Sequence, residues 1–205
     1  MAFTSCSSLL VRIGNIGNKL SENPKRSKKN FHPLPFSAKY EIDDNVTSFE
    51  DIAILLINSA QLSSMLAKND SSYKYICIFT SGCKGTPGEL NYIKRSRSER
   101  GQQVQFILIS SDNLAPYLVQ MIQKKLYSHQ YYYPVYIIDQ QIKSFLDDRK
   151  RGEIFRNQIC PDCKNDIIGV PYVLLFDQQN RVLFHGYRGY KTELPADIIK
   201  YFVGN

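Results

Sequence analysis

Long apolar runs are absent from this 205-residue sequence, and cysteine is scarce in it. No run approaches the roughly 18 apolar residues that a membrane-spanning helix needs, so the sequence predicts no such helix. Five cysteines are too few for a disulfide framework in a chain of this length. Two of them form a Cys-x-x-Cys pair, Cys160 and Cys163, and three are isolated: Cys6, Cys77 and Cys83. Ordinary fractions of hydrophobic and charged residues remain, which favour a globular domain with a full core.

Histidine is scarce as well. His32, His129 and His185 do not show the spacing of metal ligands. Structural zinc usually has four ligands in two paired knuckles, and this chain has one Cys-x-x-Cys pair. We therefore expect no metal and no other cofactor.

Positive charge exceeds negative charge, with a formal net charge of +7. Much of the excess lies in two clusters, at Lys25, Arg26, Lys28 and Lys29 and at Lys94, Arg95, Arg97 and Arg100. Neither cluster is interleaved with aromatic residues, as a platform for nucleic acid would be. We interpret them as solvated surface and expect no nucleic-acid partner; an acidic partner or a membrane surface is the alternative.

The first forty residues differ in composition from the rest. Residues 1–40 include a stretch rich in Asn, Pro, Ser and Lys, which favours a tail or tether over packed structure. The start, MAFTSCSSLL, resembles the end of a bacterial lipoprotein signal truncated at residues 1–6, with Cys6 as the lipidated residue. That resemblance predicts a cell-envelope location facing the periplasm and a membrane tether through Cys6. The alternative is a disordered cytoplasmic start with an incidental cysteine.

From residue 41 onward, strand-like and helix-like stretches alternate. A capping-box pattern at 47–50 and apolar residues at helical spacing predict a helix that ends near 67, after a short edge strand at 41–46. Apolar runs predict strands at 73–80, 104–109, 134–138 and 172–176, and a hairpin strand at 182–185. Further helices are expected at 84–100, 114–126, 142–155 and 192–202. This alternation predicts an α/β fold with a mainly parallel sheet covered on both faces.

One cysteine lies where a buried strand gives way to a helix. Cys83 follows the strand at 73–80 and a glycine-containing turn, and the helix begins just after it. Backbone N–H groups and the helix dipole stabilise an anion at such a position, and Lys84 adds a positive charge. The pattern indicates a reactive thiol. Cys77, in contrast, lies between two isoleucines in mid-strand and is expected to behave as a small hydrophobe.

Four stretches resemble the thioredoxin-like superfamily, in particular its redoxin branch, which includes TlpA-like and AhpC/TSA-like proteins. They are ICIFTSGCKGTPGEL, VQFILISSDN, YYYPVYIID and GVPYVLLFDQQNRVLFHGYRG. The resemblance covers roughly residues 41–203, and we expect residues 41–205 to form one domain. It implies a three-layer α/β/α sandwich with a central mixed sheet and a redoxin-type βα insertion.

The resemblance also implies a chemistry, thiol–disulfide exchange. Cys83 matches the attacking cysteine, and Pro171 matches the proline whose bond to the preceding residue, here Val170, is cis and which faces that cysteine. The second cysteine of the family's motif is replaced by Thr86, which either donates its hydroxyl to the Cys83 thiolate or marks a dead site. The expected partners are protein or peptide thiols and disulfides and a partner reductant.

The Cys160–Cys163 pair has two interpretations. Residues three apart on a helical turn share a face and can close a disulfide, and Pro161 fits the first turn of such a helix. The pair lies eight residues before Pro171, so one of its thiols is a candidate for resolving a mixed disulfide at Cys83. A static structural disulfide or idle thiols are the alternative.

Three other functions stay open. The missing second cysteine favours a catalytically inactive peptide-binding or structural module. A peroxiredoxin-like peroxidase has Thr three residues and Pro seven residues before its cysteine; Thr80 fits the first of these and Ile76 replaces the second. A Cys–His hydrolase would need His185 beside Cys83.

Overall fold

A six-stranded mixed sheet forms the centre of the described structure. The computed structural model describes residues 46–67, 72–100, 103–139, 148–163 and 169–187. The strands are β1 (Ile54–Ile57), β2 (Tyr73–Phe79), β3 (Val104–Ser110), β4 (Val135–Ile138), β5 (Tyr172–Phe176) and β6 (Val182–Tyr187). Their order is β1-β4-β3-β2-β5-β6. The first four are mutually parallel in this order, and β5 and β6 join them antiparallel to β2 and to each other.

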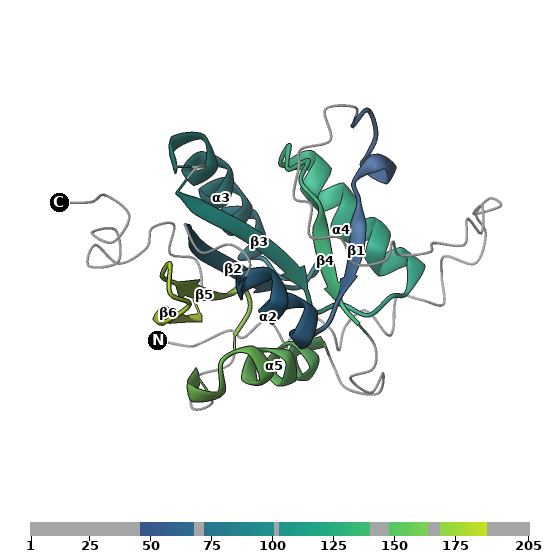
Figure 1. Cartoon of the computed structure of the whole chain (residues 1–205). Coiled ribbons are helices and arrows are strands. Elements are labelled where there is room, and N and C mark those ends of the chain that lie inside the picture. Colours follow the sequence, from purple (N-terminus) through teal and green to yellow (C-terminus); the bar gives the residue numbers. More distant parts are fainter. Residues whose placement is uncertain (1–45, 68–71, 101–102, 140–147, 164–168, 188–205) are drawn as a thin grey trace, which may run out of the picture. The chain divides into compact units, whose positions relative to one another are not determined.

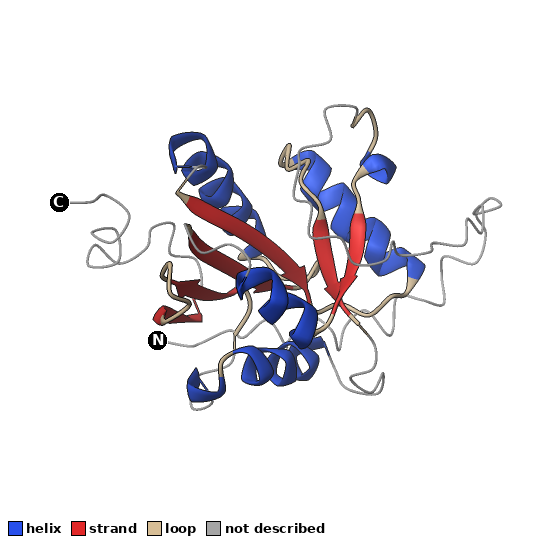
Figure 2. Cartoon of the chain, viewed as in Figure 1, coloured by secondary structure: helices blue, strands red, loops and turns tan. Residues whose placement is uncertain are grey.

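Helices cover both faces of this sheet (Figures 1 and 2). One side carries α2 (Ser59–Ala67) and α5 (Asp148–Ile159), and the other carries α3 (Thr86–Arg100) and α4 (Pro116–Ser128). Two 3-10 turns, η3 (Phe49–Asp51) and η4 (Pro161–Cys163), complete the described elements. The predicted α/β/α arrangement with a mixed central sheet is therefore confirmed.

The core follows from strand alternation, because successive side chains point to opposite faces. Alternate residues of all strands except β6 form one buried cluster with the apolar sides of α2 and α5, including Ile78, Tyr136, Phe155 and Leu174. The residues between them, such as Tyr75, Cys77 and Phe106, are buried on the other face. Cys77 is thus a small core residue, as predicted.

The helix predicted across residues 47–67 is wrong in its first half. Residues 54–57 form β1, which pairs in parallel with β4, and the helix begins at Ser59. Asn58 supplies the start: its side chain accepts a hydrogen bond from Gln61 N, and Gln61 Oε1 accepts one from Asn58 N. This reciprocal capping ends the strand and begins the helix.

Several predictions lie outside the described residues. These are the tail at 1–40 with Cys6, most of the edge strand at 41–46, the beginning of the helix at 142–155 and the helix at 192–202. Contacts divide the chain into two units, Met1–His32 and Pro33–Asn205, and every described residue belongs to the second. None of the described helices has the length and apolar character that a bilayer crossing requires.

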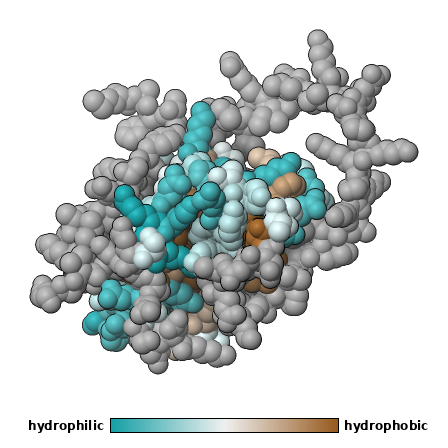
Figure 3. All heavy atoms as spheres, turned by 90° about the horizontal axis from the view of Figure 1, so that it is seen from above, coloured by the Kyte–Doolittle hydropathy of each residue, from teal (hydrophilic) through white to brown (hydrophobic). Residues whose placement is uncertain are grey.

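The basic cluster at 94–100 lies on α3. Lys94 and Arg95 are exposed, whereas Arg97 packs its guanidinium 3.4 Å from the ring centroid of Tyr133 and donates to Phe106 O. Hydrophilic residues predominate on the described surface turned to the viewer in Figure 3. Solvated surface remains the better interpretation of Lys94 and Arg95, and Arg97 serves packing.

Candidate active site

The turn between β2 and α3 carries Cys83. Cys83 N donates to Thr80 O at 3.2 Å, and Thr86 N donates to Cys83 O at 3.3 Å, so two tight turns link the strand to the helix. Cys83 is 2% exposed, while Gly82 and Lys84 on either side are exposed. The thiol therefore lies just beneath the surface, three residues before the first residue of α3.

The sulfur of Cys83 has two described neighbours with opposite effects. Its S–H donates to the carbonyl oxygen of Val170 at 2.9 Å, and the N–H of Gly85 points at the sulfur from 3.4 Å. A carbonyl acceptor stabilises the protonated thiol, whereas an N–H donor at a helix start stabilises the thiolate. The site thus offers one contact to each protonation form of the thiol.

Of the two alternatives for Thr86, donation to the thiol is not seen. The Thr86 hydroxyl donates to Thr80 O at 3.1 Å instead of to the sulfur of Cys83. Thr86 is buried, and this bond ties the first turn of α3 to the end of β2. The physical reason is that Thr80 O lies within reach of the Thr86 hydroxyl once both tight turns have formed.

Two charged side chains from other elements hold the same turn. Asp112, just beyond β3, accepts hydrogen bonds from Ser81 N at 2.7 Å, from Ser81 Oγ at 3.1 Å and from Ser110 Oγ at 2.6 Å. Lys125 of α4 donates to Ser81 O and, at 3.2 Å, to Cys83 O. The sequence analysis selected neither residue. The available signals were a charged residue just after a strand, for Asp112, and a charged residue on an otherwise buried helix face, for Lys125.

Burial raises the pKa of Asp112 above its ordinary value of 3.8, and the nearby Asp148 raises it further, against hydrogen bonds from Ser110 and Ser81 that lower it. The folded protein therefore binds this proton more tightly than the unfolded chain does. The stabilising contribution is complete below pH 3.8 and is lost as the pH rises through the folded-state pKa. We expect the free energy of unfolding of the wild type to fall over this window relative to that of Asp112→Asn. Urea unfolding of both proteins across pH measures this, and parallel pH profiles would contradict it.

The loop before β5 brings Val170 and Pro171 to Cys83. The Val170–Pro171 bond is cis, as the resemblance implies. Gly169 fits because a side chain there would collide: an added Cβ would lie 2.5 Å from Cδ2 of Tyr187. The Tyr187 ring on β6 thus packs against the backbone of this loop, and the loop in turn places the carbonyl of Val170 on the thiol.

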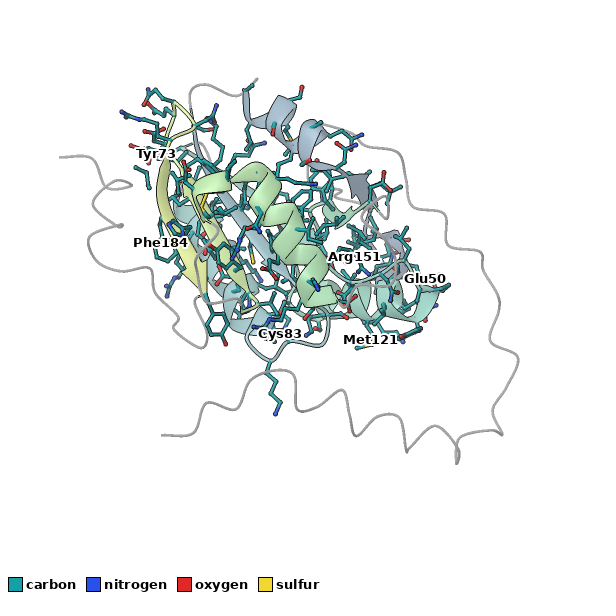
Figure 4. All side chains as sticks on the ribbon, turned by 90° about the horizontal axis from the view of Figure 1, so that it is seen from below. Glu50, Tyr73, Cys83, Met121, Arg151 and Phe184 are labelled. Atoms are coloured by element: carbon teal, nitrogen blue, oxygen red, sulfur yellow. A yellow bond between two sulfur atoms is a disulfide. The ribbon has the colours of Figure 1, made fainter. Side chains whose placement is uncertain are left out.

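The predicted Cys160–Cys163 disulfide is present and joins the residue after α5 to the last residue of η4. Both cysteines are buried in the core cluster. Gly152, in the first turns of α5, lies against Ser111 and Ile78 at the end of the sheet nearest Cys83. Cys160 follows eight residues later, about 12 Å farther along a helix. Figure 4 shows Cys83 and Arg151 toward one end of the domain and Tyr73 toward the other. The disulfide and Cys83 are therefore at different ends of α5.

A small pocket opens beside the loop that contacts Cys83. Its lining consists of Gly169, Val170 and Tyr172, of Ile78 from β2, and of Arg149, Gly152, Glu153 and Arg156 from α5. Arg156 is 2% exposed. We call this the Arg156 pocket. The sequence analysis missed it, although Arg156 follows the core residue Phe155 and precedes the partly buried Ile159 on a helix, a pattern that places a charge at the border of an apolar face.

Two other residues, Ile76 and His185, bear on the peroxidase and hydrolase alternatives. Ile76, at the position where a peroxiredoxin has proline, is a fully buried ladder residue paired with Ile107 and Leu174, so the peroxidase alternative is not favoured. The described hydrogen-bond partner of the His185 ring is the Tyr172 hydroxyl at 3.3 Å. Within the described ranges, no group of three or more His, Cys, Asp or Glu residues could hold a metal ion.

Comparison with known proteins gives likenesses of fold alone. No known protein family matches the sequence, and no curated protein does. Among solved structures, the thioredoxin domain of a thiol-disulfide oxidoreductase from Bacteroides vulgatus is 16% identical, with a TM-score of 0.46, over 68% of this chain and 84% of that one. A thioredoxin-family thiol:disulfide interchange protein from Chlorobium tepidum is 15% identical, with a TM-score of 0.44, over 67% and 84%. Copper-bound Sco1 from yeast is 16% identical, with a TM-score of 0.40, over 67% and 79%. Identities and scores this low do not assign an activity, so the function has to be argued from the site.

Proposed function

We propose that the protein carries out thiol–disulfide exchange through Cys83. The observation that carries this proposal is the position of the thiol: it lies at the start of α3, in contact with Gly85 N–H and with the carbonyl of Val170. A helix start favours the thiolate, which is the form that attacks a disulfide. Asp112 and Lys125 fix the turn from two other elements, so the sulfur is held in place before a substrate arrives.

The exchange balances without any cofactor. The Cys83 thiolate attacks one sulfur of a substrate disulfide, a new bond joins Cys83 to that sulfur, and the other sulfur leaves as a thiolate. A second thiol then attacks the mixed disulfide and regenerates Cys83. We propose that this second thiol comes from outside the domain, because Cys160 and Cys163 are bonded to each other and buried at the far end of α5. Resolution by this pair remains the alternative.

A second function is supported by a specific observation. Cys83 is 2% exposed and its S–H donates a hydrogen bond to Val170 O, which is the arrangement of a resting thiol. A peptide-binding module with an unreactive cysteine would look the same. The proposed partners are proteins or peptides with thiols or disulfides. The envelope location, with a tether at Cys6, is a separate proposal about residues outside the described ranges.

Mapping of mixed disulfides tests both functions. We expect oxidised glutathione to modify Cys83, with the adduct located by peptide mass spectrometry, and added reduced thiol to release it. The double variant Cys160→Ala/Cys163→Ala should form and release the adduct at the wild-type rate if the resolving thiol is external. A release rate that falls in this variant at low external thiol would favour the internal pair. A folded protein whose Cys83 stays unmodified would favour the binding module.

A further inference from the structure

The Arg156 pocket contains a buried cation that forms no ion pair with any described residue. The guanidinium of Arg156 donates through Nε and Nη2 to Asn157 Oδ1, at 3.2 and 2.9 Å, and lies 4.9 Å from the ring centroid of Tyr172. Nη1 is buried and has no hydrogen-bond partner among the described residues. The ion pairs of the described structure do not include Arg156.

Such an arrangement is costly unless something completes it. A buried charged donor without a partner loses hydration that neither a neutral amide oxygen nor an aromatic face fully replaces. The planar guanidinium is suited to carboxylates because it can present two parallel N–H donors to their two oxygens. Arg149 adds a second positive charge to the pocket, and Glu153 adds one negative charge.

The pocket is next to the thiol. Val170 both lines the pocket and accepts the hydrogen bond from Cys83 Sγ at 2.9 Å. Ile78, which also lines the pocket, lies on the strand that leads to Cys83. A group held in the pocket would therefore be separated from the reacting sulfur by Val170. The pocket has room for about one water-sized group, which suits one oxygen of a carboxylate and not a whole ligand.

We infer that the Arg156 pocket binds a carboxylate of the disulfide substrate and thereby selects disulfides that carry a carboxylate close to the sulfur. This inference rests on the proposed exchange at Cys83. One carboxylate oxygen enters the pocket beside Val170 and accepts a hydrogen bond from Arg156 Nη1. It takes no part in the covalent step: the Cys83 thiolate still attacks the near sulfur, and the far sulfur leaves as a thiolate.

A matched pair of disulfides tests the selection. Dithiodipropionate and its diamide, dithiodipropionamide, have the same sulfur chemistry and differ in whether the end group is charged. The corrected ratio is the rate with the acid divided by the rate with the amide, divided in turn by the same quotient for cysteine in a short peptide. We expect a corrected ratio of about ten for Cys83, because a charge-assisted hydrogen bond forms with the acid alone. In Arg156→Gln the corrected ratio should fall to about one, since the guanidinium is lost.

Two further variants give the test its controls. Lys150→Gln removes the same charge from the same helix, at an exposed position that does not line the pocket, and should keep the wild-type ratio. Glu153→Gln removes the negative charge of the pocket and should raise the ratio, so the inference stays testable if Arg156→Gln does not fold. A wild-type ratio near one, or a preference that persists in folded Arg156→Gln, would overturn it.

Failure of the exchange itself is distinguished by a binding measurement. Saturation-transfer NMR with methylthiopropionate, which has no reactive sulfur, should detect binding to the wild type and to Cys83→Ser but not to Arg156→Gln. Methylthiopropionamide should not bind. Binding of the acid to a protein whose Cys83 is unreactive would reject the exchange and keep the carboxylate site. If methylthiopropionate does not bind to the wild type, the site is rejected whatever the exchange rate.

Discussion

Replacing Cys83 with Ser is expected to reduce thiol–disulfide exchange by about a thousandfold or more, to the level of the uncatalysed reaction, because the attacking atom itself is removed. The measurement is the rate of mixed-disulfide formation and release with a small disulfide, per folded molecule. Serine is close in size to cysteine, and its hydroxyl can donate to Val170 O and accept from Gly85 N–H as the thiol does. The turn should therefore keep its geometry while the chemistry stops.

The matched control for this substitution is Cys77→Ala. Cys77 is 1% exposed in the middle of β2, where it pairs with Leu108 and Val173. Its replacement should lower stability by roughly 1 kcal/mol, as loss of a small buried group does, and leave the exchange rate unchanged. If exchange survived in Cys83→Ser and disappeared in Cys77→Ala, the nucleophile would be Cys77, and the proposal would be rejected.

The sequence predicted most of the sheet because the strands are buried on both faces. Stretches such as 73–79 and 104–110 are nearly continuous apolar runs, and a parallel central strand covered by helices requires that composition. Residues 54–57 were assigned to a helix because four apolar residues in a row fit either period. The deciding facts lie outside the run: β4 pairs with it, and Asn58 with Gln61 begins a new helix.

The candidate site was predictable only where a local pattern or the resemblance pointed to its residues. Cys83, Thr86 and Pro171 follow from a strand, a turn and a resemblance, and of the two alternatives for Thr86 the structure does not show donation to the thiol. Asp112 and Lys125 reach the turn from β3 and α4, and these contacts exist only once the sheet order has placed both beside β2. These contacts between distant residues could not be predicted from a single sequence.

The same turn has a second expected sensitivity, at Asp112. Asp112→Ala is expected to lower the free energy of unfolding by about 3 to 5 kcal/mol, because it leaves buried donors without an acceptor. The donors are Ser81 N, Ser81 Oγ and Ser110 Oγ, and both serines are at most 2% exposed. Urea unfolding at a fixed pH measures the change, and a loss below about 0.5 kcal/mol, the size of an ordinary surface substitution, would contradict the role assigned to this carboxylate.

Asp112→Ala should also slow exchange at Cys83 in the molecules that remain folded, because Ser81 is two residues before the thiol and loses its anchor. Asp112→Asn separates this positioning effect from simple instability, since the amide oxygen can still accept the Ser81 N–H bond. We expect the asparagine variant to recover most of the exchange rate while losing the titration of the carboxylate. If both variants exchanged at the wild-type rate, the turn would owe its geometry to Lys125 and to the Thr86–Thr80 hydrogen bond instead.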